Sequence, residues 1–158
     1  MIGALLTIPT MNITARVNAG LHERGFGEIT DSNSVVMKVL GPDGDRITEL
    51  ARKAAITKQS MGYLVDQLEA TGYVERVTDP SDARAVIIRR TKAGWAYNRA
   101  AADEVAQLEH EWAHMLGLTK MKQLKSLLGE LVTQLGYHYD GSSADVATRV
   151  PRQRAGKL

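Results

Sequence analysis

The chain has 158 residues, of which 44% are hydrophobic and 24% charged, and its formal net charge at pH 7 is +2. This length and composition indicate one soluble globular domain and leave too little chain for two ordinary ones. Because the chain contains no cysteine, disulfides, thiolate metal sites, thiol catalysis and cysteine-based redox sensing are excluded. No run approaches the roughly 18 apolar residues of a membrane span, so we expect a cytoplasmic protein.

Two helices are predicted before residue 41. Pro9 and Thr10 can start the first, which carries apolar residues at four-residue spacing and closes near Gly25. A second, shorter helix is expected over residues 34–40. The Gly-Pro-Asp-Gly sequence at 41–44 is a strong turn signal, and it ends this helix.

A pair of amphipathic helices joined by a very short connection follows. Apolar residues at helical spacing mark one helix over 47–54, and a second stripe begins at Met61. Thr57 is a suitable N-cap for the second helix, and Gly72 is placed to end it. Because three residues cannot carry the chain back along the first helix, the two helices must cross steeply. The segment predicts a helix-turn-helix.

Two short β-branched segments come next. "YVERVT" and "AVIIRRT" flank "DPSDAR", in which an aspartate followed by proline favours a type I turn. A helix-turn-helix followed at once by a hairpin is the element order of a winged helix. Thr91 then caps a long helix that ends near Leu116, and a final helix is expected over 118–135.

The order and spacing of these elements resemble the MarR family of dimeric winged-helix transcription factors. The resemblance covers roughly residues 10–137, and its specific part is "ITELARKAAITKQSMGYLVDQLEATGYVERVTDPSDARAVIIRRTKAG" at 47–94. It implies a mainly α fold with a small β-hairpin wing. It also implies sequence-specific binding of double-stranded DNA by a homodimer that represses transcription.

We therefore expect a single MarR-like domain over 1–140, with a winged-helix lobe at about 31–91. The dimerisation lobe would combine helices at about 10–25 and 92–137. Residues 141–158 show no periodicity and are expected to form a flexible basic tail.

The start of the second helix of the helix-turn-helix is the expected DNA-reading surface. A helix in the major groove exposes its first two turns to base edges and phosphates. Those positions are occupied by Thr57, Lys58, Gln59, Ser60, Gly62 and Tyr63. Gln59 can form two hydrogen bonds with adenine, whereas Lys58 and Ser60 suit guanine or phosphate. A glycine inside a helix costs roughly 1 kcal/mol, so Gly62 reflects either sequence drift or close approach of a backbone or base. The alternative is that this polar turn is only a solvated helix face.

Basic residues on the predicted wing form the second expected contact. In the family this turn carries Asp-x-Arg, here Asp82-Ala83-Arg84, with the arginine in the adjacent minor groove. We expect Asp82 to hold the Arg84 guanidinium in a bidentate pair; an ordinary exposed ion pair is the alternative. Residues on or beside the hairpin that suit phosphate contacts are Arg76, Arg89 and Arg90.

Apolar seams on the last two long helices predict a partner subunit. They repeat at the heptad spacing of helices that pack on one another, and one small domain cannot bury both. The dimerisation residues expected on these two helices and the first one are Val17, Leu21, Val105, Leu108, Trp112, Met115, Leu124, Leu128 and Leu131. A two-fold dimer implies a pseudo-palindromic operator with half-sites about one helical turn apart. The resemblance adds a small aromatic or phenolic effector that weakens DNA binding.

The sequence also contains His110-Glu111-x-x-His114, which is the spacing of a zinc metalloprotease. The two histidines fall off the apolar stripe, and no third histidine follows at the extended spacing of that enzyme class. We therefore predict no enzyme, no cofactor and no metal site. Three alternatives stay open: a metalloprotease, an opportunistic or regulatory metal site at the histidine pair, and a winged helix that binds protein instead of DNA.

Overall fold

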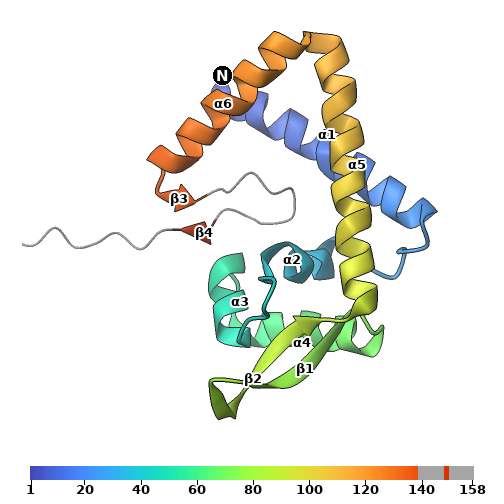
Figure 1. Ribbon diagram of the computed structural model, residues 1–158, viewed down its shortest axis with the longest axis vertical. Helices are drawn as coiled ribbons and strands as arrows, with labels where there is room; N and C mark the ends of the chain where they lie inside the picture. Colours follow the sequence, from blue (N-terminus) through green and yellow to red (C-terminus); the bar gives the residue numbers. More distant parts are fainter. Residues whose placement is uncertain (139–147, 150–158) are drawn as a thin grey trace, which may run out of the picture.

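The structure is a computed structural model that describes residues 1–138 and 148–149. Two lobes are joined by the long helix α5 (Lys92–Leu116), as Figure 1 shows. One lobe contains three helices and an antiparallel hairpin: α2 (Asp31–Val39), α3 (Ile47–Ala54), α4 (Lys58–Ala70), β1 (Val74–Asp79) and β2 (Asp82–Arg90). The predicted mainly α fold with a β-hairpin wing is confirmed.

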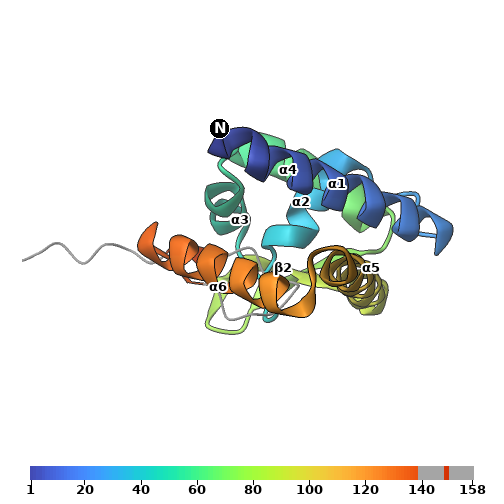
Figure 2. The ribbon, with the colours of Figure 1, turned by 90° about the horizontal axis from the view of Figure 1, so that it is seen from above.

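The other lobe contains α1 (Ile2–Glu23), which crosses α5, and α6 (Leu118–Gln134), which leads away from the end of α5. Helices α1 and α6 lie apart when seen from above (Figure 2). After α6, β3 (Tyr137–His138) pairs with β4 (Thr148–Arg149). The remaining residues of the expected tail lie outside the part of the chain that the structure describes.

Helix α1 begins at Ile2, earlier than the predicted start at Pro9 and Thr10. Pro9 lies inside the helix, although proline lacks the N–H that would bond to the carbonyl four residues back. Good helix formers before it, including Ala4 and Leu5, extend the helix in the N-terminal direction. In the same turn the Thr10 hydroxyl donates a hydrogen bond to the Leu6 carbonyl. Pro9 and Thr10, a pair that commonly starts a helix, therefore lie inside α1.

The connection between α3 and α4 has the predicted three residues. Ala55 takes a left-handed conformation, with φ of 55°, and the Ile56 N–H donates to the Ala51 carbonyl. This conformation turns the chain out of α3, at a cost of about 1–2 kcal/mol for a residue with a Cβ. The Thr57 hydroxyl then accepts the Ser60 N–H at 3.1 Å and caps α4 as predicted. Local chemistry thus sets the direction in which α4 leaves the turn.

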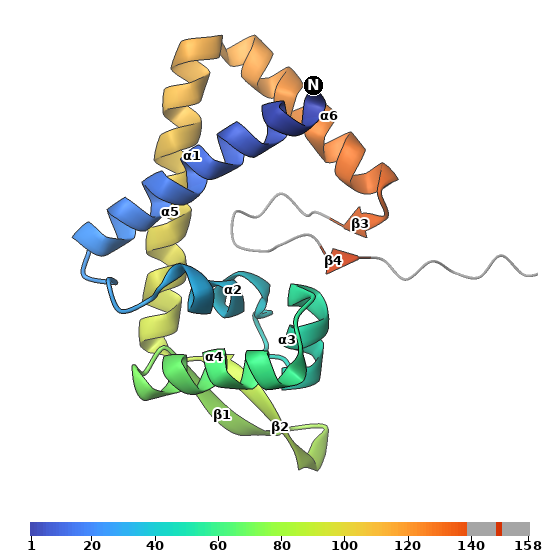
Figure 3. The same ribbon diagram turned by 180° about the vertical axis from the view of Figure 1, so that it is seen from behind.

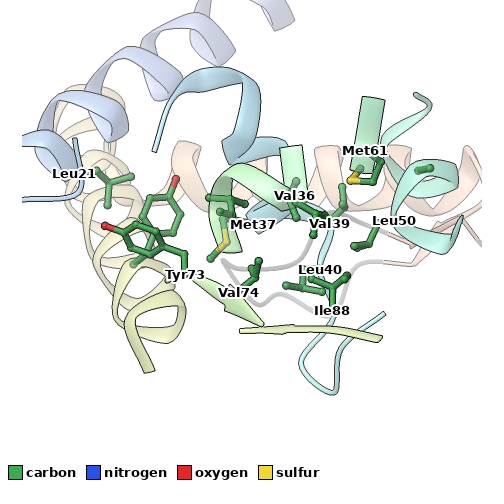
Figure 4. Close-up of a cluster of buried hydrophobic side chains, with 14 of the residues drawn as sticks. Leu21, Val36, Met37, Val39, Leu40, Leu50, Met61, Tyr73, Val74 and Ile88 are labelled. Carbon is green, nitrogen blue, oxygen red and sulfur yellow. The ribbon is translucent and has the colours of Figure 1, made fainter. Parts of the chain in front are cut away.

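An aliphatic core lies between α2, α3, α4 and the hairpin, and Figure 4 shows part of it. Its side chains include Met37, Leu40, Leu50, Met61 and Leu68, none of which is more than 1% exposed. Each such burial stabilises the fold by roughly 1.5–3 kcal/mol. Because Met61 and Leu68 anchor one side of α4, the opposite side of that helix must face solvent.

The loop before α3 is fastened to the hairpin. Asp45 and Ile88 exchange two backbone hydrogen bonds, of 2.8 and 3.1 Å. Gly44 has φ of 92°, and a Cβ at this position would lie 2.7 Å from the Ile88 carbonyl oxygen. Only glycine fits both the conformation and this close approach. The loop that leads into the helix-turn-helix is therefore attached directly to the wing.

Within residues 1–138 and 148–149, no helix combines the length and apolar character needed to cross a membrane.

Candidate nucleic-acid interface

The first turn of α4 presents a polar surface. Thr57, Lys58, Gln59 and Ser60 are all exposed, whereas Met61 is fully buried. The Thr57 and Ser60 hydroxyl oxygens lie 2.8 Å apart, so both belong to the helix cap. The side chains of Lys58 and Gln59 project from a turn whose backbone is held by that cap. As predicted for this turn, the polar groups and the core-facing group lie on different sides of the helix.

Tyr63 and Gly62 continue the exposed side of α4 into its second turn. The Tyr63 residue is 64% exposed, so its ring and hydroxyl are available to a partner. A Cβ built on Gly62 would have the Ile47 Cδ1 atom at 3.7 Å as its nearest non-local neighbour. This is an ordinary contact distance, so packing within the chain does not require glycine at position 62.

The wing ends in a tight turn at Pro80 and Ser81, where Asp79 and Asp82 are paired across the two strands. The register changes between Thr78 and Asp79, so β2 has extra residues near the tip. Arg84 lies in this irregular part and is exposed. The hairpin and α4 lie at the end of the molecule opposite the α5–α6 turn (Figure 3). Arg84 therefore lies exposed near the tip of the wing, where a ligand could contact it.

Arg46 holds the wing tip, a role that no sequence pattern indicated. Its Nε and Nη2 atoms donate to Asp79 Oδ2 at 2.9 and 2.7 Å, and Nη2 also reaches Asp82 Oδ2 at 3.3 Å. Arg46 directly precedes α3, so this fork connects the helix-turn-helix to the wing. Arg46 and Asp79 are more than thirty residues apart in the sequence, so local sequence patterns could not predict their contact.

Asp79 is the central acceptor of this cluster. Its Oδ1 atom accepts the Ser81 hydroxyl at 2.6 Å and the Ser81 N–H at 2.8 Å. Together with the Arg46 guanidinium, these bonds lower the pKa of Asp79 to about 2. The tip is therefore stabilised by an ionised carboxylate with several donors.

The predicted bidentate pair between Asp82 and Arg84 is wrong. Asp82 Oδ1 accepts the backbone N–H of Arg84 at 3.1 Å, and its other oxygen accepts Arg46. Asp82 thus shapes the backbone of the turn, and within the described residues it is not paired with the Arg84 guanidinium. An aspartate side chain is well placed to accept the backbone N–H two residues further on, and this local bond competes with a pair between the two side chains.

Arg90 was predicted to contact phosphate, and its position rules this out. It is 5% exposed, and its guanidinium donates to the carbonyls of Met37, Leu40 and Gly41. It also lies 5.0 Å from the centroid of the Trp95 ring. A buried cation here satisfies carbonyls at the end of α2 and complements the negative end of that helix dipole. Arg90 is a structural residue.

The other two hairpin arginines differ in their surroundings. Arg89 is exposed and lies 3.6 Å from Glu75 on the paired strand. Arg76 binds Asp66 at 2.6 Å and also binds Glu69, which ties β1 to the second half of α4. Both phosphate contacts stay predictions. Of the two guanidiniums, that of Arg89 is less neutralised by nearby carboxylates.

The predicted dimerisation residues divide into three groups by their exposure. Leu21 and Leu108 are each 3% exposed, so they are buried within one chain and offer a partner no surface. Val17 packs against the core, and Val105 and Trp112 are half-buried. Exposed fractions between 37% and 73% remain on Met115, Leu124, Leu128 and Leu131. The seam of α5 is therefore mostly used within the chain, whereas that of α6 is open.

The metalloprotease pattern lies on the exposed surface of α5. His110 and His114 are exposed, and Glu111 forms a bidentate pair with Arg16 of α1, with N–O distances of 2.8 and 3.1 Å. Among the described residues, no group of three or more His, Cys, Asp or Glu side chains is placed to hold a metal ion. Glu111, which would act as the general base of a metalloprotease, is thus engaged in an ion pair between α5 and α1.

Comparison with known proteins agrees with this arrangement. Residues 36–85 match the MarR family model. The HTH-type transcriptional regulator FarR of Neisseria gonorrhoeae is 28% identical over 137 residues, which span 78% of this chain and 94% of FarR.

Solved structures show the same fold. The reduced form of MarR from E. coli has a TM-score of 0.68 at 22% identity, over 84% of this chain and 96% of MarR. An S. aureus MepR variant bound to an oligodeoxyribonucleotide has a TM-score of 0.56 at 18% identity, over 85% of this chain and 98% of that chain. MepR bound to ethidium bromide has a TM-score of 0.61 at 19% identity, over 85% and 96% of the two chains. Family match, curated relative and fold all resemble those of the MarR family of winged helix-turn-helix transcriptional regulators.

Proposed function

We propose that this chain is a repressor that binds a pseudo-palindromic DNA operator as a homodimer and releases it when a small aromatic molecule binds. The observation that supports this most directly is the arrangement of the α4 surface and the wing. The polar first turn of α4 is exposed, and Arg46 fixes the neighbouring hairpin relative to it.

Two different modes of DNA contact follow from this arrangement. The Gln59 amide can donate to and accept from one adenine edge, so it would carry base preference. The exposed Arg84 guanidinium would enter the minor groove, where narrow A·T-rich segments concentrate negative potential. Lys58 and Arg89 would neutralise phosphates and make affinity depend on salt.

Uncovered apolar surface on the second lobe supports the homodimer. Leu5 and Ile8 of α1 are 69% and 66% exposed, and Leu127 of α6 is 64% exposed. Several large apolar side chains exposed on one lobe are typical of an interface that a partner covers. A two-fold pairing through this lobe would leave both α4 surfaces free for two half-sites.

A cavity between the lobes supports an effector. It has a volume of about 140 Å³ and lies between α1, α2 and α5, where Ile13, Val17, Met37 and Tyr97 line it. A cavity of about 150 Å³ accommodates a benzene ring, and Lys38 at the rim supplies a cation for a phenolate or carboxylate. Because the cavity contacts both lobes, an occupant that prefers one lobe spacing would change the separation of the two α4 helices.

The direct test is equilibrium binding to duplex fragments selected from genomic DNA. Arg84→Ala should weaken binding to all selected operators by a similar factor, whereas Gln59→Ala should change the preference among them. Arg99→Ala is the matched control, because Arg99 is exposed on α5 outside the proposed surface. Unchanged binding by both test variants would contradict the assigned surface.

The dimer has its own test. Leu128→Glu places a charge on the open stripe of α6 and should shift the sedimenting species from dimer to monomer. Gln123→Glu, on an exposed position off that stripe, should leave the dimer intact. A wild-type chain that sediments as a monomer would contradict the proposal, as would equal behaviour of both variants.

A further inference from the structure

The two histidines of α5 lie close together and have no assigned role in the proposed function. The Nε2 atoms of His110 and His114 are 3.1 Å apart, and both side chains are exposed. Among the described residues, neither imidazole has another hydrogen-bonding or ionic partner. The pair sits one turn apart on the same face of the helix, as i and i+4 residues do.

The separation of the nitrogens matches that of a bidentate metal chelate. Histidine nitrogens bind Zn²⁺ at about 2.0–2.1 Å, so two of them on one ion are about 2.8–3.4 Å apart for bond angles between about 90° and 109°. The observed 3.1 Å lies in the middle of this range. No rearrangement of the helix is needed to bring both nitrogens to one ion.

The distance between the two ring centroids distinguishes a chelating arrangement from a head-on hydrogen bond between the imidazoles. Two imidazoles joined end to end through an N–H···N bond of this length would have centroids about 5.4 Å apart. Two rings that converge on a shared ion would have centroids about 4.8 Å apart. The observed distance is 4.6 Å, with the ring planes at 86°. The rings are therefore closer together than a head-on hydrogen bond would place them, and near the separation expected for two ligands of one ion.

Neighbouring carboxylates do not complete a larger site. Glu111 is held by Arg16, and Glu109 binds Lys125 of α6 at 2.7 Å. Water would fill the remaining coordination positions, so the site differs from the closed, four-ligand sites of structural zinc. Imidazole ligands favour late first-row divalent ions over Mg²⁺ and Ca²⁺, which prefer oxygen.

We propose that His110 and His114 form a two-histidine site for a late first-row divalent cation: Zn²⁺, Ni²⁺ or Cu²⁺. Two exposed ligands on a preformed helix give a dissociation constant on the order of micromolar, well short of the affinity of buried structural zinc. The site is independent of DNA binding, so it stands even if the proposed function fails.

Metal titration of the tag-free, full-length protein tests this site. We expect one Zn²⁺ per chain in competition with a chromophoric chelator at pH 7.5. His110→Ala and His114→Ala should each weaken binding about tenfold or more, because each removes one arm of the chelate. His22→Ala is the matched control and should bind as the wild type. Mg²⁺ in excess should not displace the bound Zn²⁺.

A second readout locates the ion. In a proton NMR titration, Zn²⁺ should shift the ring signals of two histidines, and these should be the two that disappear in the double variant His110→Ala/His114→Ala. Helical circular dichroism of each variant confirms folding, since alanine is tolerated at exposed helix positions. A double variant that binds Zn²⁺ like the wild type would overturn the proposal, and so would a wild type with no binding below about 1 mM.

Discussion

Arg89 and Arg90 are adjacent in sequence, and replacing each with methionine should have opposite consequences. The Arg90 guanidinium is buried and donates to three main-chain carbonyls, at 2.9 Å for Met37 and 3.0 Å for Gly41. Hydrogen bonds to charged groups contribute about 1.5–3 kcal/mol each. Methionine fills similar volume but leaves these acceptors without their donor, so we expect Arg90→Met to lower the free energy of unfolding by about 3–5 kcal/mol. Domains are stabilised by only about 5–15 kcal/mol in total.

Arg89→Met is the matched control for stability. Arg89 is exposed, and its 3.6 Å pair with Glu75 is worth at most about 1 kcal/mol. This variant should unfold like the wild type but bind operator DNA with a smaller dependence on salt. Urea unfolding followed by circular dichroism, at one fixed protein concentration, gives both free energies. The reasoning is refuted if Arg90→Met stays within about 0.5 kcal/mol of the wild type, or if Arg89→Met is destabilised equally.

Three further variants test the wing and the DNA-reading helix. Arg46→Met frees the wing tip from α3, so operator affinity in fluorescence anisotropy should fall about tenfold with the helical content unchanged; unchanged affinity would contradict the positioning role. The pKa of Asp79 is about 2, below its ordinary value of 3.8. The ionised form therefore stabilises the fold fully above about pH 4, and this contribution is lost as pH falls through 2. Asp79→Asn should reduce the slope of unfolding free energy between these pH values, and an unchanged slope would argue against the cluster. Gly62→Ala meets no clash within the chain, so it should raise stability by up to about 1 kcal/mol while weakening operator binding. Equal or tighter binding by this variant would remove the argument for close approach of DNA.

The elements that local patterns define could be predicted from the sequence. The helix-turn-helix is the clearest case: helical periodicity marked α3, and the Thr57 cap marked the start of α4. Each signal acts within one or two turns, which is the range over which side chains contact their own helix. The start of α1 was misplaced because a proline that usually opens a helix lies inside one.

Contacts between distant segments could not be predicted in this way. In β2, two isoleucines are followed by two arginines over Ile87-Ile88-Arg89-Arg90. Either alternate set of positions could therefore face the core, so periodicity left open which arginine is buried. Arg46 and Asp79 come together only when α3 and the hairpin are folded. Leu108 was assigned to a partner because the heptad pattern does not distinguish packing within a chain from packing between chains. The four-residue spacing that includes Leu21 leaves the same choice open.

We propose above all that a symmetric dimer binds duplex DNA through α4 and the wing. The most direct measurement is the affinity and stoichiometry of the purified chain on its best selected genomic fragment, recorded as salt is raised from 50 to about 200 mM. We expect two chains per fragment, an inverted repeat with half-sites about 10 base pairs apart, and a steep loss of affinity, about 10³–10⁵-fold for six to ten phosphate contacts. A monomer that ignores every duplex fragment at the lowest salt would contradict it.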